Sequence, residues 1–179
     1  MDFEFAELPD RVVLGRDVYM APTAYVGGEV SIGDDCTIMH HVVIRGDVSA
    51  IRIGARCNVQ DGSIIHTNRG VDLDIEEEVS IGHRAVVHCR RVGQGSLIGI
   101  GSIVLDDCEI GAGCLIAAGA ILPPGTIIPP GKVVMGIPGK IIRDLRDLER
   151  VYLREVTASY QLLGRLHAAG KYPNHALHQ

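Results

Sequence analysis

Three histidines lie close together in an apolar part of the chain, and as a set they could bind one metal ion. His66 ends the segment NVQDGSIIH, and His83 and His88 lie within IGHRAVVHC. Imidazole is a common zinc ligand, and a catalytic zinc site uses three protein ligands and leaves the fourth position to water. One such histidine alone would be interpreted as an exposed polar residue. The three together, beside Gln60 and Asp61, predict a site for one divalent metal.

The expected metal is zinc, but imidazole ligands suit iron and cobalt as well. Cys89 follows His88 directly, so a sulfur ligand is an alternative to the preferred interpretation of Cys89 as a corner residue beside the site. The neighbouring pair His40 and His41 has no supporting pattern around it. We interpret that pair as structural.

The element that must position these histidines has a six-residue period. Aliphatic residues recur at this spacing over most of the chain, and the residue four positions after each of them is usually small. The repeat includes Met20, Val26, Ile32, Ile38, Ile44, Ile53, Val59, Ile65, Ile81 and Val87, resumes one residue early at Val92, and continues through Ile98, Val104, Ile110, Ile116, Leu122, Ile128 and Val134. Hexapeptide repeats of this kind are typical of parallel β-helices, in which stacked coils bury a continuous core.

Glycines after many of the aliphatic residues suit corners between short strands. The pattern resembles the left-handed β-helix family of hexapeptide-repeat proteins over about residues 20 to 138, and the handedness is implied by that resemblance. We therefore expect an all-β fold, a triangular prism with a C-terminal α-helix. Four cysteines of the small-residue column should point inward as small apolar groups, namely Cys36, Cys57, Cys108 and Cys114.

Two breaks in the period flank the histidines. Nine residues separate Ile44 from Ile53, and sixteen separate Ile65 from Ile81, where two steps would need twelve. Repeat proteins place such insertions in loops, often on the binding face. We expect the second insertion within residues 67–78.

The insertions also fix the relation between the histidines. Val87 lies 22 residues after Ile65, and removing the four inserted residues leaves 18, which is three hexapeptides or one full coil. His66 and His88 each follow one of these aliphatic residues, so they should stack on neighbouring coils about 4.8 Å apart. His83 belongs to a different edge of the prism. It would have to reach the other two from a neighbouring subunit, which predicts a cyclic homotrimer with three identical sites.

After Val134 the repeat ends at Pro138 and Gly139, and Asp144 is the expected cap of a helix. Apolar residues then recur at helical spacing, and these positions predict the face that packs on the prism: Leu145, Leu148, Tyr152, Val156, Tyr160, Leu163 and Leu166. The expected end of the helix is near Gly164 or Gly170. We expect residues 1–139 to form a lead-in and the β-helix, residues 140–170 the packed helix, and residues 171–179 a tail.

Composition restricts the classes of function. The chain of 179 residues has a formal net charge of −5, which argues against a nucleic-acid partner. Its apolar runs are too short to span a membrane. Its five cysteines form no CxxC pair, and no leader opens the sequence, so a cytoplasmic protein is expected.

The motifs RGD at residues 45–47, NVQDGSIIH, IGHRAVVHC, LIGIGSIVLD and GIPGK together resemble the γ-class carbonic anhydrases and their close relatives, over most of residues 10 to 160. The resemblance implies the metal ligands His66, His83 and His88, with His83 donated across the trimer interface. It also implies a set of supporting residues: a subunit-bridging ion pair between Arg45 and Asp47, supported by Asp61; Gln60 hydrogen-bonded to a metal-bound hydroxide; and Tyr160 near the substrate. Interface stabilisation is the alternative role for Arg45 and Asp47.

The implied reaction is the reversible hydration of carbon dioxide to bicarbonate by that hydroxide. One departure matters, because Val48 occupies the position of a glutamate that shuttles protons in the archetype of the family. The acidic residues Asp72, Asp74, Glu76, Glu77 and Glu78 offer a replacement, although such a charge run is usually a solvated face. We therefore expect weak hydration activity.

Two other functions remain open. The ending GIPGKIIR resembles that of the coenzyme A-dependent acyltransferases of the hexapeptide-repeat class, which do not need three converging histidines. The remaining possibility is a non-catalytic trimeric scaffold that binds metal. Metal content and turnover separate the three.

Overall fold

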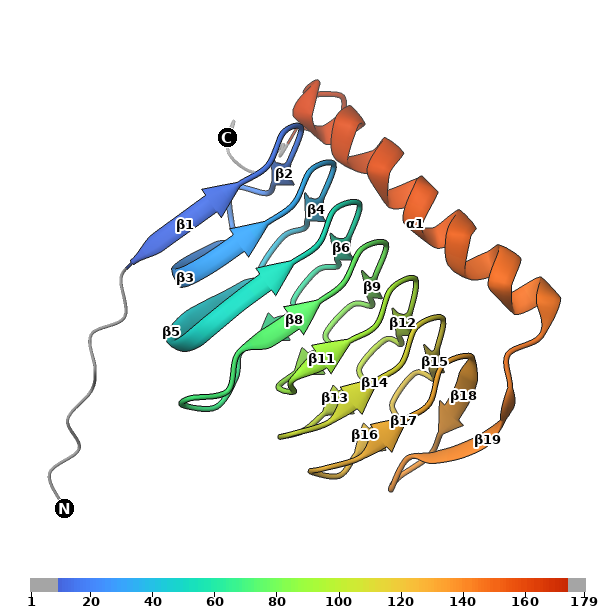
Figure 1. Ribbon diagram of the computed structural model, residues 1–179. Coiled ribbons are helices and arrows are strands. Elements are labelled where there is room, and N and C mark those ends of the chain that lie inside the picture. The colour runs from blue at the N-terminus through green and yellow to red at the C-terminus, as the bar shows by residue number, and fades with distance from the viewer. Residues whose placement is uncertain (1–9, 174–179) are drawn as a thin grey trace, which may run out of the picture.

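The computed structural model describes residues 10–173, which form a left-handed parallel β-helix with one α-helix along its side (Figure 1). The expected fold class is confirmed. The first nine residues of the predicted lead-in, and residues 174–179 of the predicted tail, lie outside the described residues. Within residues 10–173, no helix combines the length and the apolar character needed to cross a bilayer.

Each coil contributes strands to three faces of the prism. The ladder face contains the first parts of β3 (Tyr25–Ile32) and β5 (Val43–Ile53), then β7 (Ile64–Ile65), β10 (Val86–Val87), β13 (Ile103–Val104) and β16 (Ile121–Leu122). The charged face contains β1 (Arg11–Leu14), the last parts of β3 and β5, β8 (Leu73–Ile75), β11 (Arg91–Val92), β14 (Glu109–Ile110) and β17 (Ile127–Ile128). The helix face contains β2 (Tyr19–Met20), β4 (Thr37–Ile38), β6 (Asn58–Val59), β9 (Ser80–Ile81), β12 (Leu97–Ile98), β15 (Leu115–Ile116), β18 (Lys132–Met135) and β19 (Lys140–Asp144).

The aliphatic residues of the six-residue period fill the core. Ile44, Ile65 and Val87 have no exposed surface, and neighbouring coils pair in parallel register, with Ile65 opposite Val87. The four cysteines of the small-residue column are buried as predicted, since none is more than 2% exposed. Cys89 is also buried, at 1% exposed, and burial raises the pKa of its thiol. A protonated buried thiol is a poor metal ligand, which favours the structural interpretation of Cys89.

The two insertions differ from expectation. Residues 45–50 form no loop, because β5 continues without interruption and passes from the ladder face to the charged face, pairing first with β7 and then with β8. The second insertion is a loop, but it is confined to residues 66–72, since Leu73–Ile75 already form β8. A strand bent around a corner keeps its backbone hydrogen bonds, which the periodic pattern alone did not reveal.

The helix α1 (Asp147–Ala168) runs along the helix face from the C-terminal coils back toward β2 (Figure 1). The prediction that Asp144 caps it is wrong. The N-cap is Arg146, and Asp144 ends β19, where its carboxylate pairs with Lys132. The helix continues through Gly164 and ends at Ala168, close to Gly170.

The predicted packing face of α1 is wrong at its start, since Leu148 is 84% and Tyr152 53% exposed. The buried residues are instead Leu153, Thr157 and Gly164. The reason is that the underlying strands present small polar groups: the hydroxyls of Thr157 and Ser80 lie 3.2 Å apart. At Gly164 an added Cβ would lie only 2.4 Å from Thr37 Oγ1, so glycine allows the close approach of the helix.

Candidate metal centre

His66 and His88 lie on one edge of the prism, between the ladder face and the charged face. They follow the paired residues Ile65 and Val87 of β7 and β10, which places them on neighbouring coils. His66 Nδ1 and His88 Nε2 are 3.1 Å apart. Two nitrogens bound to one tetrahedral zinc, each at about 2.0–2.1 Å, are separated by about 3.3 Å. The spacing of this pair therefore fits a shared metal ion.

The other nitrogen of each ring faces a carboxylate. His66 Nε2 lies 3.0 Å from Asp47 Oδ1, and His88 Nδ1 lies 2.5 Å from Asp106 Oδ1. An ionised carboxylate only accepts hydrogen bonds, so these outer nitrogens carry the protons. In neutral rings the lone pairs of the two inner nitrogens then face each other. Two acceptors at this distance repel each other unless a proton or a metal ion lies between them.

Electrostatics around this pair follow from the same contacts. Burial lowers the pKa of His66, against the opposing effect of Asp47. Burial acts to raise the pKa of Asp47, but hydrogen bonds from Arg45 and His66 outweigh it and lower the pKa. A hydrogen bond from Asn68 is the largest cause of the lowered pKa of Asp106. Both carboxylates are thus held in the ionised, accepting form.

His83 lies on the opposite edge of the ladder face, between that face and the helix face. Its Nδ1 is 3.0 Å from Asp61 Oδ2, and its Nε2 is 3.2 Å from the hydroxyl of Tyr160 in α1. Burial raises the pKa of Tyr160, so the hydroxyl remains a donor. The carboxylate favours the proton on Nδ1, which leaves the Nε2 lone pair free to accept from Tyr160. His83 therefore shares with the other two histidines a carboxylate at one ring nitrogen, while its other nitrogen contacts Tyr160.

Gln60 and Asp61 belong to this second edge. Gln60 is 5% exposed, donates to Asn58 Oδ1 and accepts a hydrogen bond from the backbone N–H of His83. Asp61 accepts from the backbone N–H of His40 as well as contacting His83. Arg45 and Asp47 form an ion pair on the first edge. Within one chain, the contacts of Asp61 are with the second edge and not with the Arg45–Asp47 pair.

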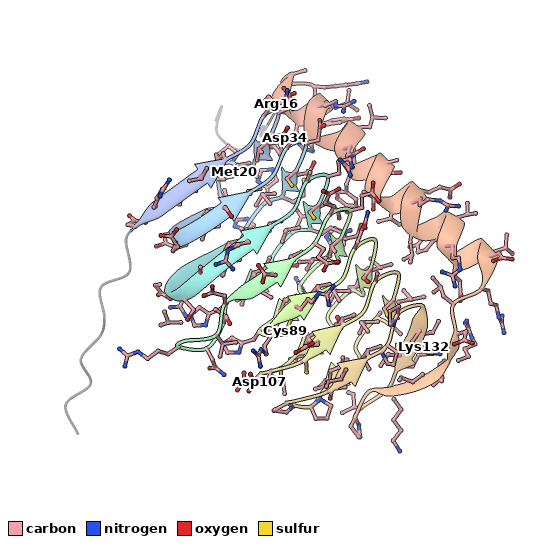
Figure 2. The ribbon with its side chains drawn as sticks, viewed as in Figure 1. Arg16, Met20, Asp34, Cys89, Asp107 and Lys132 are labelled. Carbon is pink, nitrogen blue, oxygen red and sulfur yellow. The ribbon has the colours of Figure 1, made fainter. Side chains whose placement is uncertain are left out.

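One chain thus holds two groups of site residues on opposite edges of the ladder face. Within residues 10–173, no three potential ligands of the His, Cys, Asp and Glu types gather closely enough for a metal site. Asp106 was missed from the sequence. It follows Val104 by two residues, and Val104 pairs with Val87, so alignment of the neighbouring coils was the signal that could have found it. Cys89 and Asp107 are labelled in Figure 2 and mark the edge to which His88 and Asp106 belong.

The acidic run is a solvated face. Asp72 and Asp74 pair with Arg52, Glu76 pairs with Arg91, and Glu77 and Glu78 pair with Arg56. All five carboxylates are engaged in ion pairs of the charged face or its corner. This arrangement favours a solvated charged surface over a proton shuttle as the role of these residues.

The prism and its repeat first define the class: a hexapeptide-repeat protein. A family model described as dynactin subunit 5 matches residues 15–166. A carbonic anhydrase of Geobacillus kaustophilus is 45% identical over 77% of this chain and 79% of its own length. Protein YrdA of Escherichia coli is 39% identical over 82% of this chain and 84% of its own length.

Solved structures of related proteins have the same fold. A Bacillus cereus protein provisionally named as an acetyltransferase has a TM-score of 0.86 and 34% identity, covering 89% of this chain and 93% of its own. A hexapeptide transferase family protein from Anaplasma phagocytophilum has a TM-score of 0.74 and 32% identity, covering 86% and 96%. The chain belongs to the γ-class carbonic anhydrase-like family of hexapeptide-repeat proteins. By family it is a carbonic anhydrase-like lyase.

Proposed function

We propose that the protein is a homotrimer that hydrates carbon dioxide reversibly at three metal centres between its subunits. Each centre takes His66 and His88 from one subunit and His83 from the next, and zinc is the expected metal, with iron or cobalt as alternatives. The observation that carries this proposal is the matched geometry of the three histidines. Each has a carboxylate at one nitrogen, and the pair on one edge directs two lone pairs at a common point.

The trimer is supported by the ladder face. Its outward side chains form one continuous apolar row through paired strands: Tyr25, Val43, Ile64, Val86, Ile103 and Ile121. Tyr25 is 56% and Ile64 43% exposed, and α1 lies on another face. An uncovered apolar row of this kind marks a protein interface. Because the two half-sites flank this row, cyclic packing of the ladder faces would bring His83 of one subunit to His66 and His88 of the next.

When bound, the metal would supply a hydroxide nucleophile near neutral pH, because coordination to a metal such as zinc lowers the pKa of a bound water to about 7. The residues of the chain have separate tasks around it. Asp47, Asp61 and Asp106 orient the three imidazoles through their outer nitrogens. Gln60 is an uncharged donor and acceptor beside His83, and Tyr160 directs a hydroxyl toward His83 Nε2. Arg45 holds Asp47 in its ionised form.

Subunit mixing tests this arrangement. His83→Ala and His88→Ala are purified separately, then unfolded together, refolded and loaded with Zn²⁺. Neither variant alone should retain tight metal. The mixture can form complete interfaces. In these, the His83→Ala chain supplies His66 and His88, and the His88→Ala chain supplies His83. Random assembly makes about a quarter of interfaces complete, so tight zinc should return at about a quarter of the wild-type level.

Two outcomes contradict the proposal. A monomer that binds stoichiometric metal, or a mixture with no recovered metal from wild-type-sized trimers, excludes the shared site. Hydration of carbon dioxide is then measured on zinc-loaded, cobalt-loaded and anaerobically iron-loaded wild type, with His88→Ala as the control. If no metal form exceeds that control, a metal-binding scaffold without this activity remains.

An acyltransferase is the second candidate, supported by the acetyltransferase name of the Bacillus cereus structure. Acetyl transfer from acetyl-coenzyme A to amines by metal-free protein would favour it. The facing lone pairs of His66 and His88 have no role in that chemistry. We therefore place it second.

A further inference from the structure

We infer that Asp106 and Asn68 form a positioning device for His88, which fixes the tautomer of this ligand and ties its orientation to the inserted loop. The inference rests on the proposed metal site and adds two residues to it. Asp106 lies in the corner between β13 and β14, one coil beyond His88. Asn68 lies in the loop of residues 66–72, one coil before His88.

The contacts form a chain of three side chains. Asp106 Oδ1 lies 2.5 Å from His88 Nδ1, and the interaction of Asn68 with the Asp106 carboxylate is the largest cause of the lowered pKa of Asp106. The carboxylate accepts the Nδ1 proton, so the lone pair of His88 is on Nε2, the nitrogen that faces His66. Carboxylates in this relation to a ligating histidine set its tautomer and orientation, and their loss typically costs about 10- to 100-fold in metal affinity or activity.

The inserted loop is anchored well enough to hold Asn68 in place. Thr67 Oγ1 donates to the carbonyl of Val71 over 2.7 Å, and the backbone N–H of Val71 donates to Ser49 Oγ over 3.1 Å. Asp72 closes the loop by accepting from the backbone N–H of Ala50 and pairing with Arg52. The loop is therefore fixed to β5, and its polar insertion delivers Asn68 to the carboxylate that orients His88.

A purely structural role for the Asp106 side chain is disfavoured by its surroundings. The side chain is 42% exposed and fills no part of the core. The corner itself is held by the backbone, where the carbonyl of Asp106 accepts from the N–H of Gly125 over 2.8 Å. Removing the carboxylate should leave the coil intact. What changes is the freedom of His88 to rotate and to place its proton on Nε2.

The test compares four full-length variants with wild type, each in the oligomeric state in which it is purified. Asp106→Ala removes the acceptor, Asp106→Asn keeps one acceptor oxygen, and Asn68→Ala releases the carboxylate. Asp107→Asn is the matched control, because Asp107 is the exposed next residue and its positive φ of 56° is tolerated by asparagine. Zn²⁺ affinity is measured by competition with a chelator. The visible spectrum of the Co²⁺-loaded protein reports ligand geometry.

Asp106→Ala should weaken zinc binding about 10- to 100-fold and alter the cobalt spectrum. Asp106→Asn should recover part of that loss, Asn68→Ala should show a smaller loss, and Asp107→Asn should match wild type. Melting of the metal-free variants should be unchanged. Wild-type affinity and spectrum in Asp106→Ala would overturn this inference alone. Absence of metal binding in wild type would instead overturn the proposed metal site.

Discussion

The two faces of the prism that α1 leaves uncovered share one core but differ in their outward residues. On the ladder face one row of paired outward residues, from Tyr25 to Ile121, is apolar throughout. On the charged face the corresponding row contains Ser31, Arg52, Asp74, Arg91, Glu109 and Ile127. The inward residue of each strand is aliphatic on both faces. The outward column alone therefore decides which face is suited to water and which to protein.

The same difference explains where the candidate site lies. Both groups of site residues flank the ladder face, with His66 and His88 on one edge and His83 on the other. Arg52 and Arg91 of the charged face form ion pairs with Asp72, Asp74 and Glu76 of the same chain. A face that is complete in one chain needs no partner. In the proposed trimer, the ladder face and its two edges would become complete only between chains.

The largest expected effect comes from placing a charge on the ladder face. Ile103→Glu would place three carboxylates together in the proposed trimer, and buried or juxtaposed like charges cost several kcal/mol. The association constant should fall by more than about a thousandfold, giving monomers that have lost tight metal. Sedimentation or light scattering measures the mass.

The matched control is Ile127→Glu, which places the same charge on the charged face, where Ile127 is 68% exposed. Its mass and metal content should equal those of wild type. Equal effects of the two substitutions would show that the faces do not differ in function.

Lowering the pH should have an intermediate effect on the stability of the fold, through a carboxylate of the charged face. Burial acts to raise the pKa of Glu76, but hydrogen bonds from the backbone N–H of Gln94 and from Arg91 outweigh it and lower the pKa below its ordinary value of 4.5. A lowered folded-state pKa stabilises the fold above pH 4.5, and this contribution is lost as the pH falls through the folded-state value.

Glu76→Gln should remove that dependence and cost about 1 kcal/mol of unfolding free energy at pH 7. Denaturant unfolding at pH 7 and below pH 4.5 measures both quantities. Identical slopes of stability against pH for wild type and variant would contradict this assignment. The six outward residues of the ladder face include no carboxylate, so that row should contribute nothing to the acid response in this range.

The smallest effect is expected from a single exposed ion pair. Arg52 pairs with Asp72 and Asp74, but its side chain is 52% exposed, and such pairs contribute about 0–1 kcal/mol. Arg52→Ala should lower the unfolding free energy by no more than this amount, less at high salt, and should leave the proposed trimer unchanged. A loss of association in this variant would assign an interface role to the charged face.

Much of this architecture could be predicted from the sequence because the repeat ties residue type to position. The six-residue period placed Ile65 and Val87 on neighbouring coils, and counting the inserted residues placed His66 above His88. The same count placed His83 on another edge. Each of these inferences depends on local spacing, which a stacked repeat converts directly into distance.

The errors arose where tertiary packing overrides local pattern. The apolar spacing of α1 predicted Leu148 and Tyr152 as buried, but the surface beneath the helix is lined by the hydroxyls of Thr37 and Ser80, so Thr157 and Gly164 pack there instead. Asp144 is of a residue type that often caps helices, but here it ends β19 and its carboxylate pairs with Lys132. Asp106 was overlooked because it is an ordinary surface residue until its coil is aligned with that of His88.

The five buried thiols have a practical consequence. They are distributed along the stack, from Cys36 near the N-terminal coils to Cys114 near the C-terminal ones, and each is 2% exposed or less. A stacked repeat loses its coils by fraying from an end, and a buried thiol reacts only after its own coil has opened. The order in which these cysteines become labelled under mild denaturation therefore records the direction in which the molecule unravels, with no reporter group added.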